Sequence, residues 1–327
     1  MQLVLDSSGL QISRKAGTFV VERGKAKRII SPSKLTSIAV TSNIILHSNV
    51  IALAIQHQIP ILFFDGIGKA VGRLWSPNFI SISTLRRYQV KFSETPLAMN
   101  WMVDIFYLKT DGQKKNLEFL KGKKFSLGSD ISNAIKDIKR HQRDLEAFRQ
   151  NLPEESRNSI MGKEGGIARI YWQALGRNLP SAYTFSKRTR RPAEDFFNAA
   201  LNYWYGMLYS VVEGGLFAAG LDPYLGILHA DEYQKPTLCF DLIEAFRPWI
   251  DRLLIQACLE KKLLKSHFTK NQYGYFLNKT GKAVLIPMFN DFMRSDKKFL
   301  GRETQVKSHV HFIAMQLAQR IRAFGEN

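Results

Sequence analysis

Cysteine is almost absent from this chain. Its 327 residues include only Cys239 and Cys258, too few for a disulfide framework and without the spacing of zinc ligands. Both lie among apolar residues, as buried free thiols do in a reducing compartment. The first residues lack the charged segment and long apolar run of a signal peptide. We therefore expect a cytoplasmic protein.

Long hydrophobic runs are also scarce. The most apolar stretch, residues 203–221, carries Glu213, Gly214 and Gly215 near its centre. A carboxylate at that depth would be costly in lipid, so the stretch is predicted to be a buried helix of a globular core. We expect no membrane partner.

Acidic residues are few relative to basic ones. The chain has 47 lysines and arginines against 28 aspartates and glutamates, which leaves a net charge of +19. Such an excess attracts polyanions, usually nucleic acid or an anionic membrane surface. Residues 161–260 differ, because they hold 10 basic and 11 acidic side chains. A cation held between these carboxylates and a bound phosphate would explain why acidic residues gather here in a basic protein. The alternative explanation is that these acids form ordinary salt bridges and helix caps.

Turn residues and periodicity divide the chain in two. In residues 1–80, short apolar runs alternate with turn signals, Asp65-Gly66 among them, and one short helix is expected at 48–58. From residue 81, glycine and proline become sparse and apolar residues recur at helical spacing. The sequence therefore predicts an α+β protein, with a small sandwich-like β-rich domain at 1–80 and a larger all-α domain at 81–327.

The first candidate cluster is Gly162-Lys163-Glu164-Gly165-Gly166, followed by a helical run. One interpretation is a helix start with a favourable acid in its first turn. The other is functional, because the glycines would let a phosphate backbone or another chain approach closely while Glu164 supplies an oxygen ligand.

The second cluster is a turn followed by a histidine. Gly220-Leu221-Asp222-Pro223 ends the preceding helix and sends an apolar segment toward His229. A lone histidine beside apolar residues is more often a core residue than a ligand. His229 becomes a candidate only where carboxylates converge on it.

The third cluster pairs two acids, Asp241 and Glu244, within an apolar segment. Their spacing is that of a capping box, with Asp241 as the N-cap and Glu244 reaching back. If the helix begins earlier, both acids project from one face, and two buried acids require a cation or hydrogen-bond donors.

Together, Glu164, His229 and Glu244 provide the mixed oxygen and nitrogen ligands that suit Mg²⁺ or Mn²⁺. A basic run between the first two clusters is either a solvated loop or a phosphate contact, and the charge of the whole protein favours phosphate contact. Its charged members are Lys187, Arg188, Arg190 and Arg191.

In this order, the clusters resemble those of the universal CRISPR-associated adaptation endonuclease, the integrase subunit that inserts new spacers into the array. The resemblance covers essentially the whole chain. It rests on residues 35–40, 48–50, 59–72, 164–171, 191–192, 198–203, 220–229 and 241–248.

The resemblance implies a β domain for dimerisation at 1–80 and a catalytic helical domain at 81–327. By motif, the metal ligands correspond to Glu164, His229 and Glu244, with Asp241 adjacent and assisting catalysis. The residues that would hold DNA phosphates near the metal are Arg169, Lys187, Arg188, Arg190, Arg191 and Arg247.

The sequence departs from the family pattern at three positions. Glutamate stands at position 244, where many members carry aspartate, and its longer reach could shift the metal slightly. Ala193 stands where proline is frequent, and Trp204 where glycine is frequent. These last two departures concern packing and loop geometry more than chemistry.

The implied activity is nicking and strand transfer that depend on Mg²⁺ or Mn²⁺. The 3′-hydroxyl of a captured DNA fragment would join the CRISPR repeat by direct transesterification. The implied partners are double-stranded and branched DNA, a second copy of the chain in a homodimer, and the small companion CRISPR adaptation protein. Two other functions remain open: a stand-alone metal-dependent nuclease on branched or single-stranded DNA, and a non-catalytic basic DNA-binding scaffold.

Overall fold

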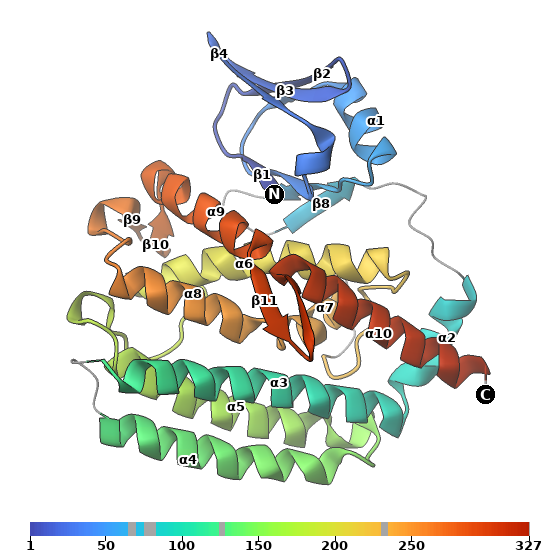
Figure 1. Cartoon of the computed structure of the whole chain (residues 1–327), viewed down its shortest axis with the longest axis vertical. Helices are drawn as coiled ribbons and strands as arrows, with labels where there is room; N and C mark the ends of the chain where they lie inside the picture. The colour runs from blue at the N-terminus through green and yellow to red at the C-terminus, as the bar shows by residue number, and fades with distance from the viewer. Residues whose placement is uncertain (65–69, 75–82, 124–127, 230–234, 327) are drawn as a thin grey trace. The chain divides into compact units, whose positions relative to one another are not determined.

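The computed structural model describes residues 1–64, 70–74, 83–123, 128–229 and 235–326. The chain forms two compact units, one of Met1–Ile80 with Ile286–His309 and one of Ser81–Leu285 with Val310–Asn327. The predicted α+β class is confirmed, because strands dominate the N-terminal region and helices dominate the rest (Figure 1). The predicted turn at Asp65-Gly66 lies outside the described residues.

The first unit is built on two four-stranded sheets. Its strands are β1 (Gln2–Leu5), β2 (Gln11–Lys15), β3 (Thr18–Arg23), β4 (Ala26–Ile30), β5 (Ser37–Val40), β6 (Ile45–Leu46), β7 (Ile61–Phe64) and β8 (Ala70–Leu74). One sheet has the order β1-β5-β7-β8, with β1 and β7 parallel to β5 and β8 antiparallel to β7. The other has the order β4-β3-β2-β6 and is antiparallel except for the β2–β6 pair.

Helix α1 (Ser48–Gln56) contributes to the core of this unit through Val50 and Leu53, which are buried with strand residues such as Ile12 and Ile38. The helix ends slightly earlier than the predicted 48–58. Gln58 has a φ of 55°, in the left-handed region that few side chains adopt, and helical geometry therefore stops before it.

Residues 286–309 join the first unit through Asn290. The Gln2 N–H donates to Asn290 Oδ1 at 3.0 Å, and Asn290 Nδ2 donates to the Gln2 carbonyl at 3.2 Å, both in buried surroundings. The segment also forms an antiparallel hairpin of β11 (Asp296–Phe299) and β12 (Arg302–Gln305). The predicted boundary at residue 81 places this segment in the second domain, because an asparagine within a helical run gives no sign of a distant strand as its partner.

The second unit consists mainly of helices. They are α2 (Ser83–Ser93), α3 (Pro96–Lys121), α4 (Gly128–Asp144), α5 (Pro153–Arg177), α6 (Phe196–Ala218), α7 (Thr237–Ile243) and α8 (Arg247–Leu259). Helices α9 (Lys279–Arg294) and α10 (Val306–Glu326) each have residues in both units. An antiparallel hairpin of β9 (Phe268–Asn271) and β10 (Gly274–Leu277) adds strands to a domain predicted as all-α.

Helices α3, α4 and α5 pack side by side (Figure 1). The helical spacing of apolar residues predicted from residue 81 is seen on α4, where Ile131, Ile135 and Ile138 are buried. The apolar stretch at 203–221 falls largely in α6, where Glu213 is buried. No helix in the described ranges has both the length and the apolar composition that crossing a lipid bilayer requires.

Candidate active site

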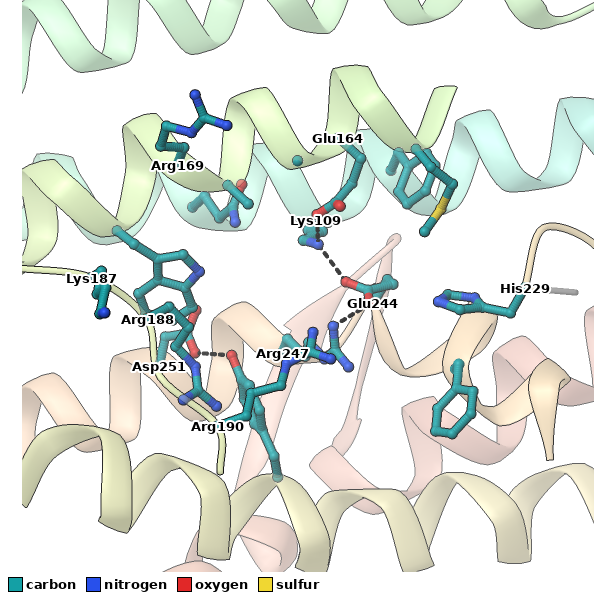
Figure 2. A pocket seen from close by; sticks show the side chains of 18 of the residues that line it. Lys109, Glu164, Arg169, Lys187, Arg188, Arg190, His229, Glu244, Arg247 and Asp251 are labelled. Atoms are coloured by element: carbon teal, nitrogen blue, oxygen red, sulfur yellow. Dashed lines mark hydrogen bonds and ion pairs between the residues drawn. The ribbon is translucent and has the colours of Figure 1, made fainter. Parts of the chain in front are cut away.

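A pocket of about 720 Å³ opens among helices α3, α5, α6, α7 and α8 of the second unit. The three predicted metal ligands, Glu164, His229 and Glu244, all line it, although 80 residues separate the first from the last. Figure 2 shows these side chains directed into the same space. The predicted phosphate contacts that line the pocket are Arg169, Lys187, Arg188, Arg190 and Arg247. Arg191 is exposed and lies outside this lining.

Glu164 lies well inside helix α5, which begins at Pro153. The interpretation of its cluster as a helix start is therefore wrong. Cβ atoms built at Gly162, Gly165 and Gly166 would meet no atom of the described residues within 4 Å. Glycine inside a helix costs about 1 kcal/mol relative to alanine, and packing among the described residues does not require it here. Of the three, Gly165 lines the pocket with Glu164, whereas Gly162 and Gly166 lie two residues from Glu164 and face another side of the helix.

Asp241 lies inside helix α7, and Glu244 stands at its C-terminal end. The capping-box interpretation is therefore wrong. Asp241 is fully buried and accepts hydrogen bonds from the backbone N–H groups of Ile227 at 2.7 Å, Leu228 at 3.3 Å and His229 at 3.2 Å. Its carboxylate thus fixes the turn that carries His229, and it lies behind the pocket lining.

The imidazole of His229 is oriented by the same carboxylate. Its Nδ1 lies 2.7 Å from Asp241 Oδ1, and because a carboxylate only accepts, Nδ1 carries the hydrogen. This arrangement leaves Nε2 as the nitrogen that can bind a cation or exchange a proton. Histidines that bind metals are commonly held by a carboxylate in this way.

Lys109 is the central residue of the pocket, and the sequence analysis did not identify it. Its ammonium group, on α3, contacts Glu164 and lies 2.5 Å from Glu244 Oε2 (Figure 2). Arg247 contacts the other oxygen of Glu244. Burial opposes the charge on Lys109, but Glu244 and Glu164 raise its pKa above the ordinary value. Burial likewise opposes the charge on Glu244, but Arg247 and Lys109 hold its pKa down at about 2. Lys109, Glu244 and Arg247 are therefore charged at neutral pH.

A signal for Lys109 was present in the spacing of α3. Met102, Phe106, Lys109, Gln113 and Asn116 follow one another at intervals of three or four residues and are all buried. Polar side chains on the core face of a helix need partners. Gln113 Oε1 and Arg247 Nε, on pocket-lining residues, are buried without a hydrogen-bond partner among the described residues.

The donor set suits a hard divalent cation in type. Glu164 and Glu244 already converge on one cation, the Lys109 ammonium, and His229 faces the same space (Figure 2). Oxygen donors with one imidazole are the ligands of Mg²⁺ and Mn²⁺. As the side chains are arranged, the described residues contain no group of three His, Cys, Asp or Glu that could hold a metal ion. What the described residues show is two carboxylates that contact one ammonium group, with His229 in the lining of the same pocket.

The basic loop between α5 and α6 is held in place by Asn198. This fully buried side chain accepts from the Thr189 N–H at 3.0 Å and from Arg188 at 2.9 Å, and donates to the Lys187 carbonyl at 3.1 Å. At the far end of the loop, the Tyr275 N–H donates to the Ala193 carbonyl at 2.9 Å. The loop is thus fixed to α6 and to β10.

Arg188 and Arg247 share an aromatic support. Their guanidinium groups lie over the ring of Tyr205, at 5.5 and 5.3 Å from its centroid. The Tyr205 hydroxyl donates to Asp251 Oδ1 at 2.5 Å, and the Tyr171 hydroxyl donates to Oδ2 at 3.0 Å. Burial raises the pKa of Asp251 to about 7, although the two tyrosines, Arg188 and Arg247 partly oppose the change.

This buried carboxyl predicts a pH dependence of stability. Between pH 4 and 7 the folded chain holds a proton on Asp251 that the unfolded chain releases, so the free energy of unfolding falls as pH rises through that window. One pKa unit is worth about 1.4 kcal/mol, and the total loss approaches roughly 4 kcal/mol. Asp251→Asn has no such proton, so urea unfolding of both proteins from pH 4 to 8 should give curves that diverge. Parallel curves would contradict the assignment.

Comparisons with known proteins agree on one family. The profile of the family described as CRISPR associated protein Cas1 matches residues 3–291. The chain is 27% identical over 320 residues to CRISPR-associated endonuclease Cas1 1 of Archaeoglobus fulgidus, covering 94% of this chain and 92% of that protein. It is 26% identical over 285 residues to a protein of the same name from Thermodesulfovibrio yellowstonii, covering 86% and 88%.

Solved structures share the fold. A Cas1 protein from Thermotoga maritima matches with a TM-score of 0.81 and 22% identity, over 98% of this chain and 97% of that one. A casposase bound to integration product matches with a TM-score of 0.83 and 21% identity, over 98% and 90%. A Cas6-RT-Cas1–Cas2 complex matches with a TM-score of 0.78 and 22% identity, over 99% of this chain and 35% of that one.

Proposed function

This chain belongs to the CRISPR-associated Cas1 family, and from that premise we propose that its pocket joins captured DNA to a CRISPR repeat. Members of the family are endonucleases, and the enzyme is of the endonuclease and integrase type. In the proposed reaction, the 3′-hydroxyl of a DNA fragment attacks a phosphodiester of the repeat in the presence of Mg²⁺ or Mn²⁺. One P–O bond forms and one breaks, and the proton lost by the incoming hydroxyl is balanced by one gained by the leaving oxygen.

The observation that carries this proposal is the convergence of two distant carboxylates on one buried cation. Glu164 comes from the middle of α5 and Glu244 from the end of α7, and both contact Lys109. Carboxylates are unfavourable in a pocket that binds a polyanion unless a cation stands between them and the phosphate. Glu164 and Glu244, with His229, are the residues that would hold a divalent cation. When bound, such a cation stabilises charge on the attacked phosphate.

The other lining residues have roles that follow from their positions. Arg188 and Arg247, fixed over Tyr205, present guanidinium groups to phosphate oxygens. The Nε2 atom of His229, oriented through Asp241, has one lone pair and serves one role at a time: it binds the cation, or it accepts the proton of the incoming hydroxyl and returns it to the leaving oxygen. The open space at Gly165, which lines the pocket next to Glu164, lets a phosphate backbone approach closely.

The partners and the division of labour are part of the same proposal. Residues 1–80 would serve dimerisation and residues 81–327 catalysis, in a homodimer that acts in the cytoplasm on double-stranded and branched DNA. The small companion adaptation protein would bridge two such dimers. The similar structures of a Cas6-RT-Cas1–Cas2 complex and of a casposase bound to integration product support these partners.

Blocking the 3′ end of the fragment is the experiment that tests this function. Labelled duplex fragments ending in a 3′-hydroxyl or a 2′,3′-dideoxy sugar are incubated with the chain, its companion protein, Mn²⁺ and a plasmid that carries leader and repeat. We expect joining with the hydroxyl end and none above background with the blocked end, while cleavage of branched DNA persists in both.

Two results would overturn the assignment. Metal-dependent cleavage with both fragments and joining with neither would mean that the chain acts as a stand-alone nuclease, because hydrolysis uses water and not the 3′-hydroxyl. DNA binding without any metal-dependent cleavage or joining would mean that it is a scaffold.

A further inference from the structure

Lys109 gives the candidate metal site a charge balance that does not require a metal. The two carboxylates, Glu164 and Glu244, carry two negative charges, and Lys109 and Arg247 carry two positive charges in direct contact with them. The side chains of Lys109 and Glu244 are only 7% and 5% exposed. Solvent therefore screens these contacts weakly.

A divalent cation entering this cluster meets an unfavourable field. Two bare carboxylates would attract it strongly, but the net charge of the four groups is zero, and the Lys109 ammonium stands at the point where the carboxylates converge (Figure 2). The ammonium cannot simply be left without an anion, because a buried unpaired charge is strongly destabilising. Metal entry therefore requires another negative group for Lys109.

The same pocket is lined by the cations that would bring such a group. Lys187, Arg188, Arg190 and Arg169 line it alongside Lys109, and they can hold the phosphates of a DNA strand. A phosphate held there adds negative charge next to the ammonium. It can replace a carboxylate as the partner of Lys109 and leave Glu164 and Glu244 to the metal.

We propose that Lys109 makes metal binding conditional on DNA. In the free protein, it holds Glu164 and Glu244 together and competes with the divalent cation. When DNA enters, Lys109 turns to a phosphate and the carboxylates accept Mg²⁺ or Mn²⁺. The inference rests on the proposed function, because it takes the DNA-joining pocket as the metal site. It makes Lys109 a positioning residue, which acts through the two carboxylates.

Such a device would keep the nuclease inactive until its substrate is in place. Binding of metal and of DNA would be mutually reinforcing, and by thermodynamic linkage each must raise the affinity of the other by the same factor. A coupling of this kind is measurable without any turnover. It should also disappear when the competing ammonium is removed.

The test is Mn²⁺ binding, followed by electron paramagnetic resonance of the free ion. Wild-type chain and Lys109→Met are titrated alone and with a branched DNA that ends in a 2′,3′-dideoxy sugar, so that no joining occurs. We expect DNA to raise the Mn²⁺ affinity of the wild type at least about tenfold. Free Lys109→Met should bind Mn²⁺ about tenfold more tightly than free wild type, and DNA should raise that affinity by less than about threefold.

Lys114→Met is the matched control. Lys114 lies on the same helix and is also largely buried, but it pairs with Asp111 at 2.7 Å and donates to Gln142 at 2.6 Å outside the pocket lining. Its Mn²⁺ binding should equal that of the wild type. Removal of a buried lysine can weaken the fold, so melting curves with and without Mn²⁺ accompany each titration.

The proposal is overturned if free Lys109→Met binds Mn²⁺ no more tightly than the wild type. It is also overturned, independently of any variant, if the wild type binds Mn²⁺ equally well with and without DNA. Its failure can be told from failure of the proposed function. If the wild type joins 3′-hydroxyl fragments but shows no coupling, only the role of Lys109 is wrong.

Discussion

Glu164→Gln should reduce DNA cleavage and joining by at least about a thousandfold while DNA affinity stays within about threefold of the wild type. Glutamine keeps the size of the side chain and removes the charge that would hold a divalent cation. Lys109 keeps Glu244 as a partner, so the substitution does not leave it as a buried unpaired charge. The loss should therefore fall on chemistry and not on folding. Initial rates of joining and nicking, with binding by fluorescence anisotropy, measure the two effects separately.

Glu155→Gln is the control for this prediction. Glu155 lies in the first turn of the same helix α5 and is exposed, so its replacement changes the net charge of the protein equally without touching the pocket. It should retain wild-type rates. A Glu164→Gln protein that keeps more than a tenth of the wild-type joining rate would exclude Glu164 as a metal ligand.

Asp241→Ala should lower the free energy of unfolding by about 3–5 kcal/mol. Three backbone N–H groups and the His229 ring donate to the Asp241 carboxylate, and the side chain is fully buried. Alanine leaves all four donors without this acceptor in a site that water reaches poorly. Urea denaturation followed by circular dichroism measures the effect.

Two further variants test the Asp241 prediction, one as a milder substitution at the same site and one as a surface control. Asp241→Asn keeps one acceptor oxygen and should lose less stability, yet its activity should fall because the amide no longer holds the His229 ring as a carboxylate does. Asp137→Ala removes a half-exposed acid that pairs with Arg140 at the surface of α4, at 3.2 Å, and should change stability by less than about 1 kcal/mol. A loss below 1 kcal/mol for Asp241→Ala would contradict its structural role.

Much of the fold was predictable because its signals are local. Turn residues between short apolar runs indicate strands in the first 80 residues, and buried residues such as Ile131, Ile135 and Ile138 follow helical spacing in α4. Asn290 illustrates what is not local. Its partner is the backbone of Gln2, 288 residues away, and no pattern within either segment indicates the other.

The sequence indicates which side chains could bind a cation, but it does not indicate how the helices place them. The glycines around Glu164 indicate a helix start. Helix α5 nevertheless continues across these glycines, because Ile160, Ile167 and Tyr171 recur at helical spacing and are buried on one face of the helix. The family resemblance places Asp241 beside the predicted ligand Glu244, as a residue that assists catalysis. In the fold, its carboxylate contacts the His229 turn instead of the pocket.

Lys109 could not be assigned from sequence because its function depends on two partners from other helices. A lysine on an apolar helix face signals a buried charge, but it does not identify Glu164 and Glu244 as the groups that neutralise it. The basic loop shows a similar limit. Composition predicts that Arg188 and Arg191 bind phosphate alike, whereas the fold places Arg188 in the pocket lining and Arg191 outside it.

The central claim is that Glu164 and Glu244 hold the divalent cation that the reaction needs. The most direct measurement is the amount of Mn²⁺ bound, at equal free Mn²⁺, by the DNA complexes of the wild type and of the Glu164→Gln/Glu244→Gln double variant. The account predicts that the wild-type complex retains Mn²⁺ that the variant complex lacks, with both proteins folded and bound to DNA. Equal binding of Mn²⁺ by the two complexes would contradict it.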